Sequence, residues 1–133
     1  MNPRYPLVAA RAAHRCEYCR APESIFNFPF EVEHIVPPKQ RGDDDESNLA
    51  LSCRACNLFK ASHLEYADPE SGDEAPLFNP RSDQWTDCFR AEIESGTIIG
   101  LNATGRATIA CLAMNSIAQR AARMDWMRLG LFP

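Results

Sequence analysis

The sequence lacks any apolar run of 18 residues or more, so we expect no membrane-spanning helix and no membrane partner. The first residues contain no apolar stretch of the kind that a secretory signal needs, and we therefore expect a cytoplasmic protein. Internal repeats and low-complexity tracts are also absent. Hydrophobic residues make up 45% of the chain and charged residues 24%, which excludes a disordered or fibrous protein and favours a globular one.

The chain also lacks an overall positive charge, since its formal net charge is −4. The acidic excess comes from residues 64–94, which hold nine acids and two arginines, whereas residues 1–63 are neutral in sum and residues 95–133 are basic. A nucleic-acid partner is therefore not excluded, but it would have to bind a locally basic surface.

Six cysteines in a chain with no secretory signal do not favour a disulfide framework. Four of them form two pairs of identical spacing, Cys16-x2-Cys19 and Cys53-x2-Cys56, which is typical of a tetrahedral four-cysteine Zn²⁺ site. Four buried reduced thiols are the alternative. Of the other two, Cys111 lies in an apolar helical stretch and is expected in the core, while the place of Cys88 stays open.

Hydrophobic spacing predicts an α+β protein. We expect four helical or strand segments up to residue 66, then a turn-rich connector with a subdomain boundary, and then a hairpin and two helices. The core would span residues 1–66 and a C-terminal extension packed on it residues 67–133. The expected elements are helices at 6–14, 54–66, 104–114 and 116–129, strands at 28–34 and 49–52, a loop at 39–47, a connector at 68–80 and a hairpin at 85–101.

The segment between the cysteine pairs carries a recognisable pattern. Residues 33–37 read E-H-I-V-P and residues 48–60 read N-L-A-L-S-C-R-A-C-N-L-F-K. Together with both cysteine pairs, this pattern over roughly residues 12–62 resembles the HNH endonucleases. The resemblance implies a zinc-stapled ββα-metal (His-Me finger) core and hydrolysis of phosphodiesters in nucleic acid, with DNA as the expected substrate. The strand, loop, strand and helix order agrees with that core.

The residue types suit this chemistry. His34 at a strand end can act as general base, because imidazole titrates near neutrality. Glu33 and Asn57 offer two oxygen ligands to one catalytic ion, Mg²⁺ or Mn²⁺. The resemblance implies that Asn48 holds the loop and orients the histidine and that Lys60 faces the phosphate. For binding nucleic acid we name four basic residues: Lys39, Arg41, Arg54 and Lys60.

The chain departs from the commonest family pattern at two site positions. Glu33 stands where aspartate is more usual, and the last position is Asn57 where many members have histidine. Both residues still offer a side-chain oxygen atom as a ligand for a metal ion. The C-terminal half is similar to the tail of small bacterial HNH proteins, which usually carry histidine where Cys88 stands in W-T-D-C-F.

Each of these residues also has a plainer interpretation. His34 can be a structural histidine, Asn57 a helix cap, Lys60 a surface lysine and residues 43–46 a solvated acidic loop. The main alternative function is a catalytically inactive, zinc-stabilised module that binds nucleic acid. A structural or interaction protein that uses the acidic segment 64–94 is the other. One motif of this kind cuts one strand, and monomer and homodimer both stay open.

Overall fold

The structure described here is a computed structural model of residues 1–133. The chain divides into two units, residues 1–62 and residues 63–133, and each is described separately. The sequence places the expected boundary slightly later, after residue 66. None of the helices combines the length and the apolar character that crossing a membrane requires.

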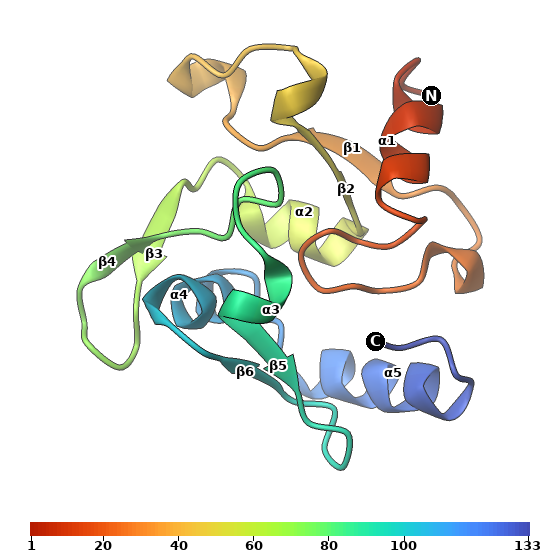
Figure 1. The fold of residues 1–133 in the computed structure, drawn as a ribbon, viewed down its shortest axis with the longest axis vertical. Helices are drawn as coiled ribbons and strands as arrows, with labels where there is room; N and C mark the ends of the chain where they lie inside the picture. The colour runs from red at the N-terminus through yellow and green to blue at the C-terminus, as the bar shows by residue number, and fades with distance from the viewer. The chain divides into compact units, whose positions relative to one another are not determined.

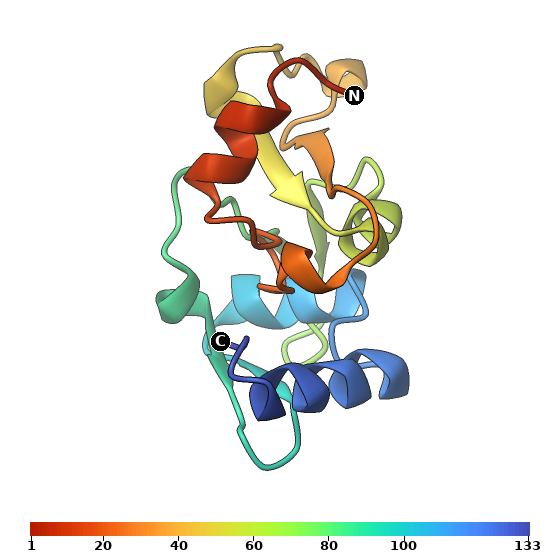
Figure 2. The ribbon, with the colours of Figure 1, turned by 90° about the vertical axis from the view of Figure 1, so that its right-hand side faces the viewer.

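The N-terminal unit is built around one antiparallel strand pair. Its elements in chain order are α1 (Tyr5–Arg11), η1 (Glu23–Ile25), β1 (Glu31–His34), η2 (Pro38–Gln40), η3 (Glu46–Asn48), β2 (Leu49–Ser52) and α2 (Arg54–Lys60), where η marks a short 3-10 helix. β1 pairs with β2 so that Glu33 lies opposite Ala50 and His34 opposite Leu49. Figures 1 and 2 show α1 on one side of this pair and α2 on the other. The expected strand, loop, strand and helix order is confirmed.

Both strands of this pair were expected, but the first is shorter. All four residues of β2 are buried, as the apolar run 49–51 predicts. β1 begins only at Glu31, and Phe28, which was expected to start it, is 53% exposed. Pro29 explains the late start, because proline has no N–H to donate to a partner strand.

Two expected helices end early, each at a left-handed residue. α1 stops at Arg11, since Ala13 and His14 have φ angles of 54° and 56° and turn the chain into the first cysteine pair. α2 stops at Lys60 because Ala61 has a φ of 47°. The expected continuation of this helix to Tyr66 is therefore wrong. Left-handed backbone at residues other than glycine is costly, and apolar periodicity does not predict it.

The C-terminal unit contains two hairpins and three helices. In chain order these are β3 (Glu65–Ala67), β4 (Glu74–Pro76), α3 (Trp85–Cys88), β5 (Phe89–Ala91), β6 (Ile98–Gly100), α4 (Ala103–Cys111) and α5 (Ile117–Arg128). α4 contacts β3, β4, β6 and α3, and is the central element of this unit (Figure 1). The expected α+β class is confirmed, as are the final two helices. The later hairpin forms only from Phe89 onward, because residues 85–88, which were expected in it, form α3. The β3–β4 hairpin was missed, since β3 was assigned to the end of the helix at 54–66 and β4 to the connector, and three-residue strands show too little alternation.

The core of the C-terminal unit is aromatic. Phe89 lies 5.4 Å from Phe78 and 5.0 Å from Trp85, measured between ring centroids. These side chains and Trp126 are buried. Cys111 is also buried, which agrees with its expected place in the core.

Candidate active site and metal centre

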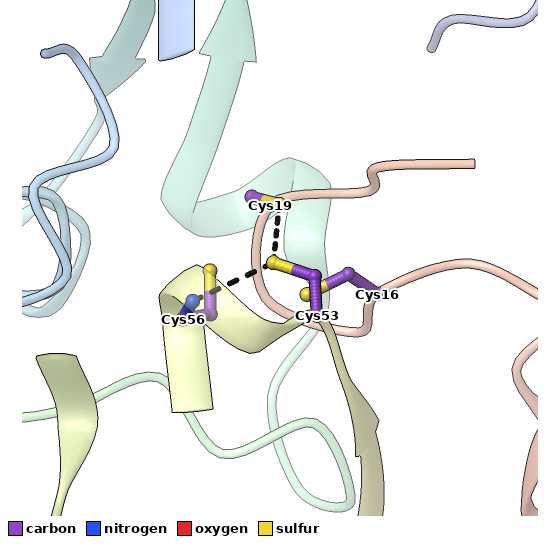
Figure 3. A group of neighbouring side chains, drawn as sticks. All are labelled: Cys16, Cys19, Cys53 and Cys56. Carbon is purple, nitrogen blue, oxygen red and sulfur yellow. Dashed lines mark hydrogen bonds between the residues drawn. The ribbon is translucent and has the colours of Figure 1, made fainter. Parts of the chain in front are cut away.

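The two cysteine pairs meet in one buried cluster in the N-terminal unit (Figure 3). The four sulfur atoms, from Cys16, Cys19, Cys53 and Cys56, all lie within 4.8 Å of one another. The Sγ atoms of Cys19 and Cys53 are 3.8 Å apart. A tetrahedral zinc ion with bonds of about 2.3 Å separates its sulfur ligands by about 3.8 Å. The cluster therefore fits a structural Zn²⁺ ion, as the spacing predicts.

Main-chain pairing explains how cysteines so far apart in sequence come together. The first pair is carried on a turn, and Glu17 within that turn is tied to β2 at Leu51. The Glu17 backbone N–H donates to the Leu51 carbonyl at 2.9 Å, and the Leu51 N–H donates to the Glu17 carboxylate at 2.8 Å. Since β2 leads directly into Cys53, this double contact sets the first pair beside the second.

The start of α2 favours thiolate ligands. Cys53 is the N-cap of α2, and its sulfur accepts a hydrogen bond from the Cys56 backbone N–H at 3.5 Å. The positive end of a helix stabilises a thiolate at this position. Hydrogen bonds from Cys16 and the other cluster thiols lower the pKa of Cys53.

Cys88 lies outside the cluster. Its sulfur accepts a hydrogen bond from Asn102 Nδ2 at 3.6 Å, and burial raises the pKa of its thiol.

His34 stands at the end of β1 with 29% of its side chain exposed. Its Nε2 atom lies 2.9 Å from Oδ1 of Asp44, a residue of the loop that follows β1. His34 can therefore reach solvent and substrate while one ring nitrogen is held by the protein. The other two histidines lie in different surroundings: His14 contacts Glu23, and His63 makes an edge-to-face contact with Tyr66.

Asn48 closes the loop between β1 and β2. Its Oδ1 accepts from the Val36 N–H at 2.9 Å, and its Nδ2 donates to the carbonyls of Val36 at 3.0 Å and Asp43 at 2.7 Å. Gly42 lies against the same point, where a Cβ atom would come within 1.7 Å of the Val36 oxygen. Only glycine fits there, because any side chain would collide with backbone. Asn48 thus holds the loop through hydrogen bonds, and Gly42 lets the backbone approach Val36 closely.

Glu33 points inward, into a buried hydrogen-bonded group with Tyr18 and Lys60. Its carboxylate accepts a hydrogen bond from the Tyr18 hydroxyl at Oε1 and lies 3.4 Å from Lys60 Nζ at Oε2. Burial raises the pKa of Glu33, and Lys60 and Tyr18 oppose that rise. Burial and the neighbouring carboxylate raise the pKa of Tyr18 well above its ordinary value, so the phenol stays protonated and donates.

The expected position of Lys60 is not the one observed. Lys60 is 1% exposed, and its ammonium donates to the Ile35 carbonyl at 2.9 Å in addition to Glu33. It therefore does not face a phosphate at the surface in this structure. A lysine at the end of a short helix is usually solvated, so the sequence favoured exposure. The other three basic residues named for nucleic-acid contact, Lys39, Arg41 and Arg54, are exposed as expected.

Asn57 shares a helix face with Lys60, three residues away on α2, and is half-buried. Because Lys60 contacts Glu33, this face of α2 is directed at the residue that precedes His34. A carboxylate offers about four acceptor positions, of which Glu33 uses two here, and an asparagine oxygen adds another. The donor types fit a hard divalent cation such as Mg²⁺ or Mn²⁺.

Comparison with known proteins was made against this geometry. Residues 16–62 match the family model of the HNH endonuclease. Residues 16–62 form an HNH domain. Neither a search of curated proteins nor a search of solved structures gave a match. The matched range begins at the first cluster cysteine and ends just after α2, so the zinc-type cluster belongs to the HNH domain.

Two residues of the HNH domain that contact the expected site were missed in the sequence. Tyr18 lies between the first two cysteines, at a position that the metal motif leaves free, and nothing in the sequence marks it. Asp44 lies in an acidic run that was interpreted as a solvated loop. Its place in the loop joining the histidine strand to Asn48 was the one available signal. The match to this family suggests nuclease activity in general and a nucleic-acid substrate.

Proposed function

We propose that the HNH domain is a metal-dependent endonuclease that hydrolyses DNA phosphodiester bonds with His34 as general base. The supporting observation is the position of His34, which ends β1 with part of its ring exposed and with one ring nitrogen held by Asp44. Within the range matched by the HNH family, this is a histidine that can accept a proton from water beside bound substrate.

The proposed reaction is a hydrolysis. His34 takes a proton from a water molecule, the water oxygen attacks phosphorus, and the bond to the leaving oxygen breaks. The leaving oxygen then takes up a proton. Asn48 keeps the loop beside His34 in one conformation through its contacts to Val36 and Asp43, which limits movement of the base between turnovers.

Glu33 and Asn57 are the proposed ligands of the catalytic divalent ion. When bound, such an ion neutralises charge on the scissile phosphate and stabilises the leaving oxygen. Glu33 lies next to His34 in the chain, and Asn57 shares the α2 face that meets Glu33 through Lys60. The Lys60 ammonium already compensates part of the Glu33 charge, so the ion would share this carboxylate with a lysine.

The exposed basic residues Lys39, Arg41 and Arg54 are the proposed contacts to the nucleic-acid backbone. Lys39 lies in η2, which the structure ties to the residues after α2 through a hydrogen bond from Gln40 Nε2 to the Ser62 carbonyl at 2.6 Å. Exposed cationic side chains suit a phosphate backbone, and binding through them weakens with salt.

The proposal is tested on supercoiled plasmid, which has no ends and therefore reports only endonuclease activity. Zinc-loaded protein is incubated with Mg²⁺, with Mn²⁺, with added Zn²⁺ alone and without added metal. We expect nicked circles with Mg²⁺ or Mn²⁺ and none in the other two reactions. Substitution of Glu33→Gln or Asn57→Ala should raise the Mn²⁺ concentration needed for half-maximal nicking. Equal metal requirements in wild type and both variants would contradict the assignment of these ligands.

A catalytically inactive module that binds nucleic acid is the second candidate. The observation that favours it is the occupancy of Glu33, whose two oxygens are both engaged by Tyr18 and Lys60. This candidate predicts a salt-dependent gel shift of DNA with no nicking under any metal. Binding that is lost on changing Lys39 and Arg41 to alanine, in protein that never cleaves, would establish it over the nuclease.

A further inference from the structure

The acidic loop of the HNH domain supplies a partner to the proposed base. Oδ1 of Asp44 lies 2.9 Å from Nε2 of His34. An ionised carboxylate can only accept hydrogen bonds, so the ring must donate its Nε2–H to it. In the neutral imidazole this leaves the lone pair on Nδ1. We propose that Asp44 is a positioning residue that fixes the tautomer and the ring orientation of His34, an inference that rests on the proposed function.

The loop presents Asp44 in a defined place. Asn48 Nδ2 binds the carbonyl of Asp43, the residue directly before Asp44, at 2.7 Å. The Asp43 carboxylate in turn accepts from the Asp45 N–H at 3.1 Å, so the residues on both sides of Asp44 are held. Nη2 of Arg4, the N-cap residue of α1, lies 3.5 Å from the second oxygen of Asp44. Asp44 thus has one oxygen on His34 and the other near a cation.

A chemical consequence follows for the direction of proton transfer. With Nε2–H given to Asp44, the water that His34 activates must lie at Nδ1. In the step, the proton of that water passes to Nδ1, the water oxygen forms the new bond to phosphorus, the bond from phosphorus to the leaving oxygen breaks, and the leaving oxygen takes a proton from solvent water. The positive charge that then forms on the ring is adjacent to the Asp44 carboxylate, as in other histidine and carboxylate pairs.

Asp44 is exposed, and this distinguishes a role in orienting His34 from a role in stabilising the fold. Its side chain is 77% exposed. Ion pairs at that exposure contribute little to folding, because solvent and salt screen them. Asp44 should therefore matter for the orientation of His34 and not for the stability of the fold. Glu46 offers a matched control, since it lies in the same acidic run, is exposed, carries the same charge and contacts Arg11 through its backbone carbonyl, which alanine keeps.

The test compares full-length, zinc-loaded wild type with Asp44→Ala and Glu46→Ala. Ring-nitrogen chemical shifts are recorded by NMR at about pH 8, above the usual range of imidazole titration. The chain has three histidines, so His14 and His63 serve as internal references. Asp44→Ala should shift the His34 Nε2 resonance and leave the references in place, while Glu46→Ala should shift none. Denaturant unfolding should be the same for all three proteins.

Plasmid nicking supplies the second readout. Asp44→Ala should lower kcat roughly tenfold with the KM for DNA unchanged, because the base is misoriented and substrate contacts remain. Identical His34 shifts in wild type and Asp44→Ala, or an unchanged kcat, would overturn the proposal. If the wild type shows no nuclease activity, the proposed function fails, and the NMR comparison still decides whether Asp44 orients the ring.

Discussion

Lys60 and Glu33 form an ion pair inside the HNH domain, with Nζ and Oε2 3.4 Å apart and side chains 2% and 6% exposed. The pair joins the last residue of α2 to the strand residue that precedes His34. Removing two charges from water is costly, and the Lys60 bond to the Ile35 carbonyl and the Tyr18 bond to Glu33 offset part of that cost. This contact gives α2 a fixed position against the histidine strand.

Replacing one residue of this ion pair by an uncharged one should destabilise the N-terminal unit strongly. We predict that Lys60→Met lowers the free energy of unfolding by about 3–5 kcal/mol, because it leaves the Glu33 carboxylate buried without its cation. Urea unfolding followed by circular dichroism measures the effect. Lys39→Met, at an exposed lysine, should change it by less than about 0.5 kcal/mol.

The double variant Glu33→Gln with Lys60→Met makes the prediction sharper. Because it removes both charges, it should be more stable than Lys60→Met alone. If the double variant loses the sum of the two single effects, the residues are not coupled and the ion pair is not the cause.

The Tyr18 hydroxyl should matter for stability without affecting zinc. Tyr18→Phe keeps the ring between Cys16 and Cys19 but removes the donor to Glu33 Oε1. We expect a loss of about 1–3 kcal/mol, the usual cost of leaving a buried acceptor unpaired, with one zinc ion per chain retained. Tyr5→Phe is the control, since Tyr5 donates to the carboxylate of Glu23 at 2.8 Å in a less buried setting. An equal or larger loss for Tyr5→Phe would argue against a special role for the buried bond.

Zinc removal should unfold the N-terminal unit. The four cluster cysteines link the first turn of the HNH domain to the start of α2. We predict that Cys56→Ser, or a strong chelator on the wild type, abolishes zinc binding and the cooperative unfolding transition of this unit. Cys111→Ser, a core thiol outside the cluster, should retain one zinc ion per chain. Zinc content by atomic absorption, beside thermal unfolding, checks both statements.

Low pH should lower the stability of the C-terminal unit, because Asp68 becomes protonated. This buried carboxylate accepts two hydrogen bonds of 2.9 Å from Arg106, and these bonds hold its pKa well below the ordinary value. A lowered pKa contributes stability above the unfolded-state pKa of about 3.9, and that contribution is lost as the pH falls toward the folded-state value. The difference in melting temperature between wild type and Asp68→Asn should therefore be constant near neutrality and shrink below about pH 4. Asp73→Asn, at an exposed acid, should show no such difference at any pH.

The local motifs predicted the metal cluster and the order of elements around it. Two cysteine pairs of fixed spacing allow few arrangements, and the apolar run 49–51 admits one buried strand. These features depend on residues close together in sequence, so they can be predicted without knowing the fold.

The partners of the site residues could not be predicted in the same way. Lys60 is buried because Ile35 and Glu33 lie opposite it, which depends on how α2 crosses β1. Asp44 reaches His34 because Asn48 folds the loop back. The early helix ends at Arg11 and Lys60 follow from left-handed residues, which apolar spacing does not mark.

The central claim, that this HNH domain is a nuclease with His34 as its base, is tested most directly by one comparison. Nicking of supercoiled plasmid in Mn²⁺ is measured for wild type, His34→Ala and His63→Ala, all with one bound zinc and the same unfolding midpoint. We predict nicking by the wild type and by His63→Ala at equal rates, and a loss of about a hundredfold or more in His34→Ala. Equal nicking by His34→Ala would contradict the account.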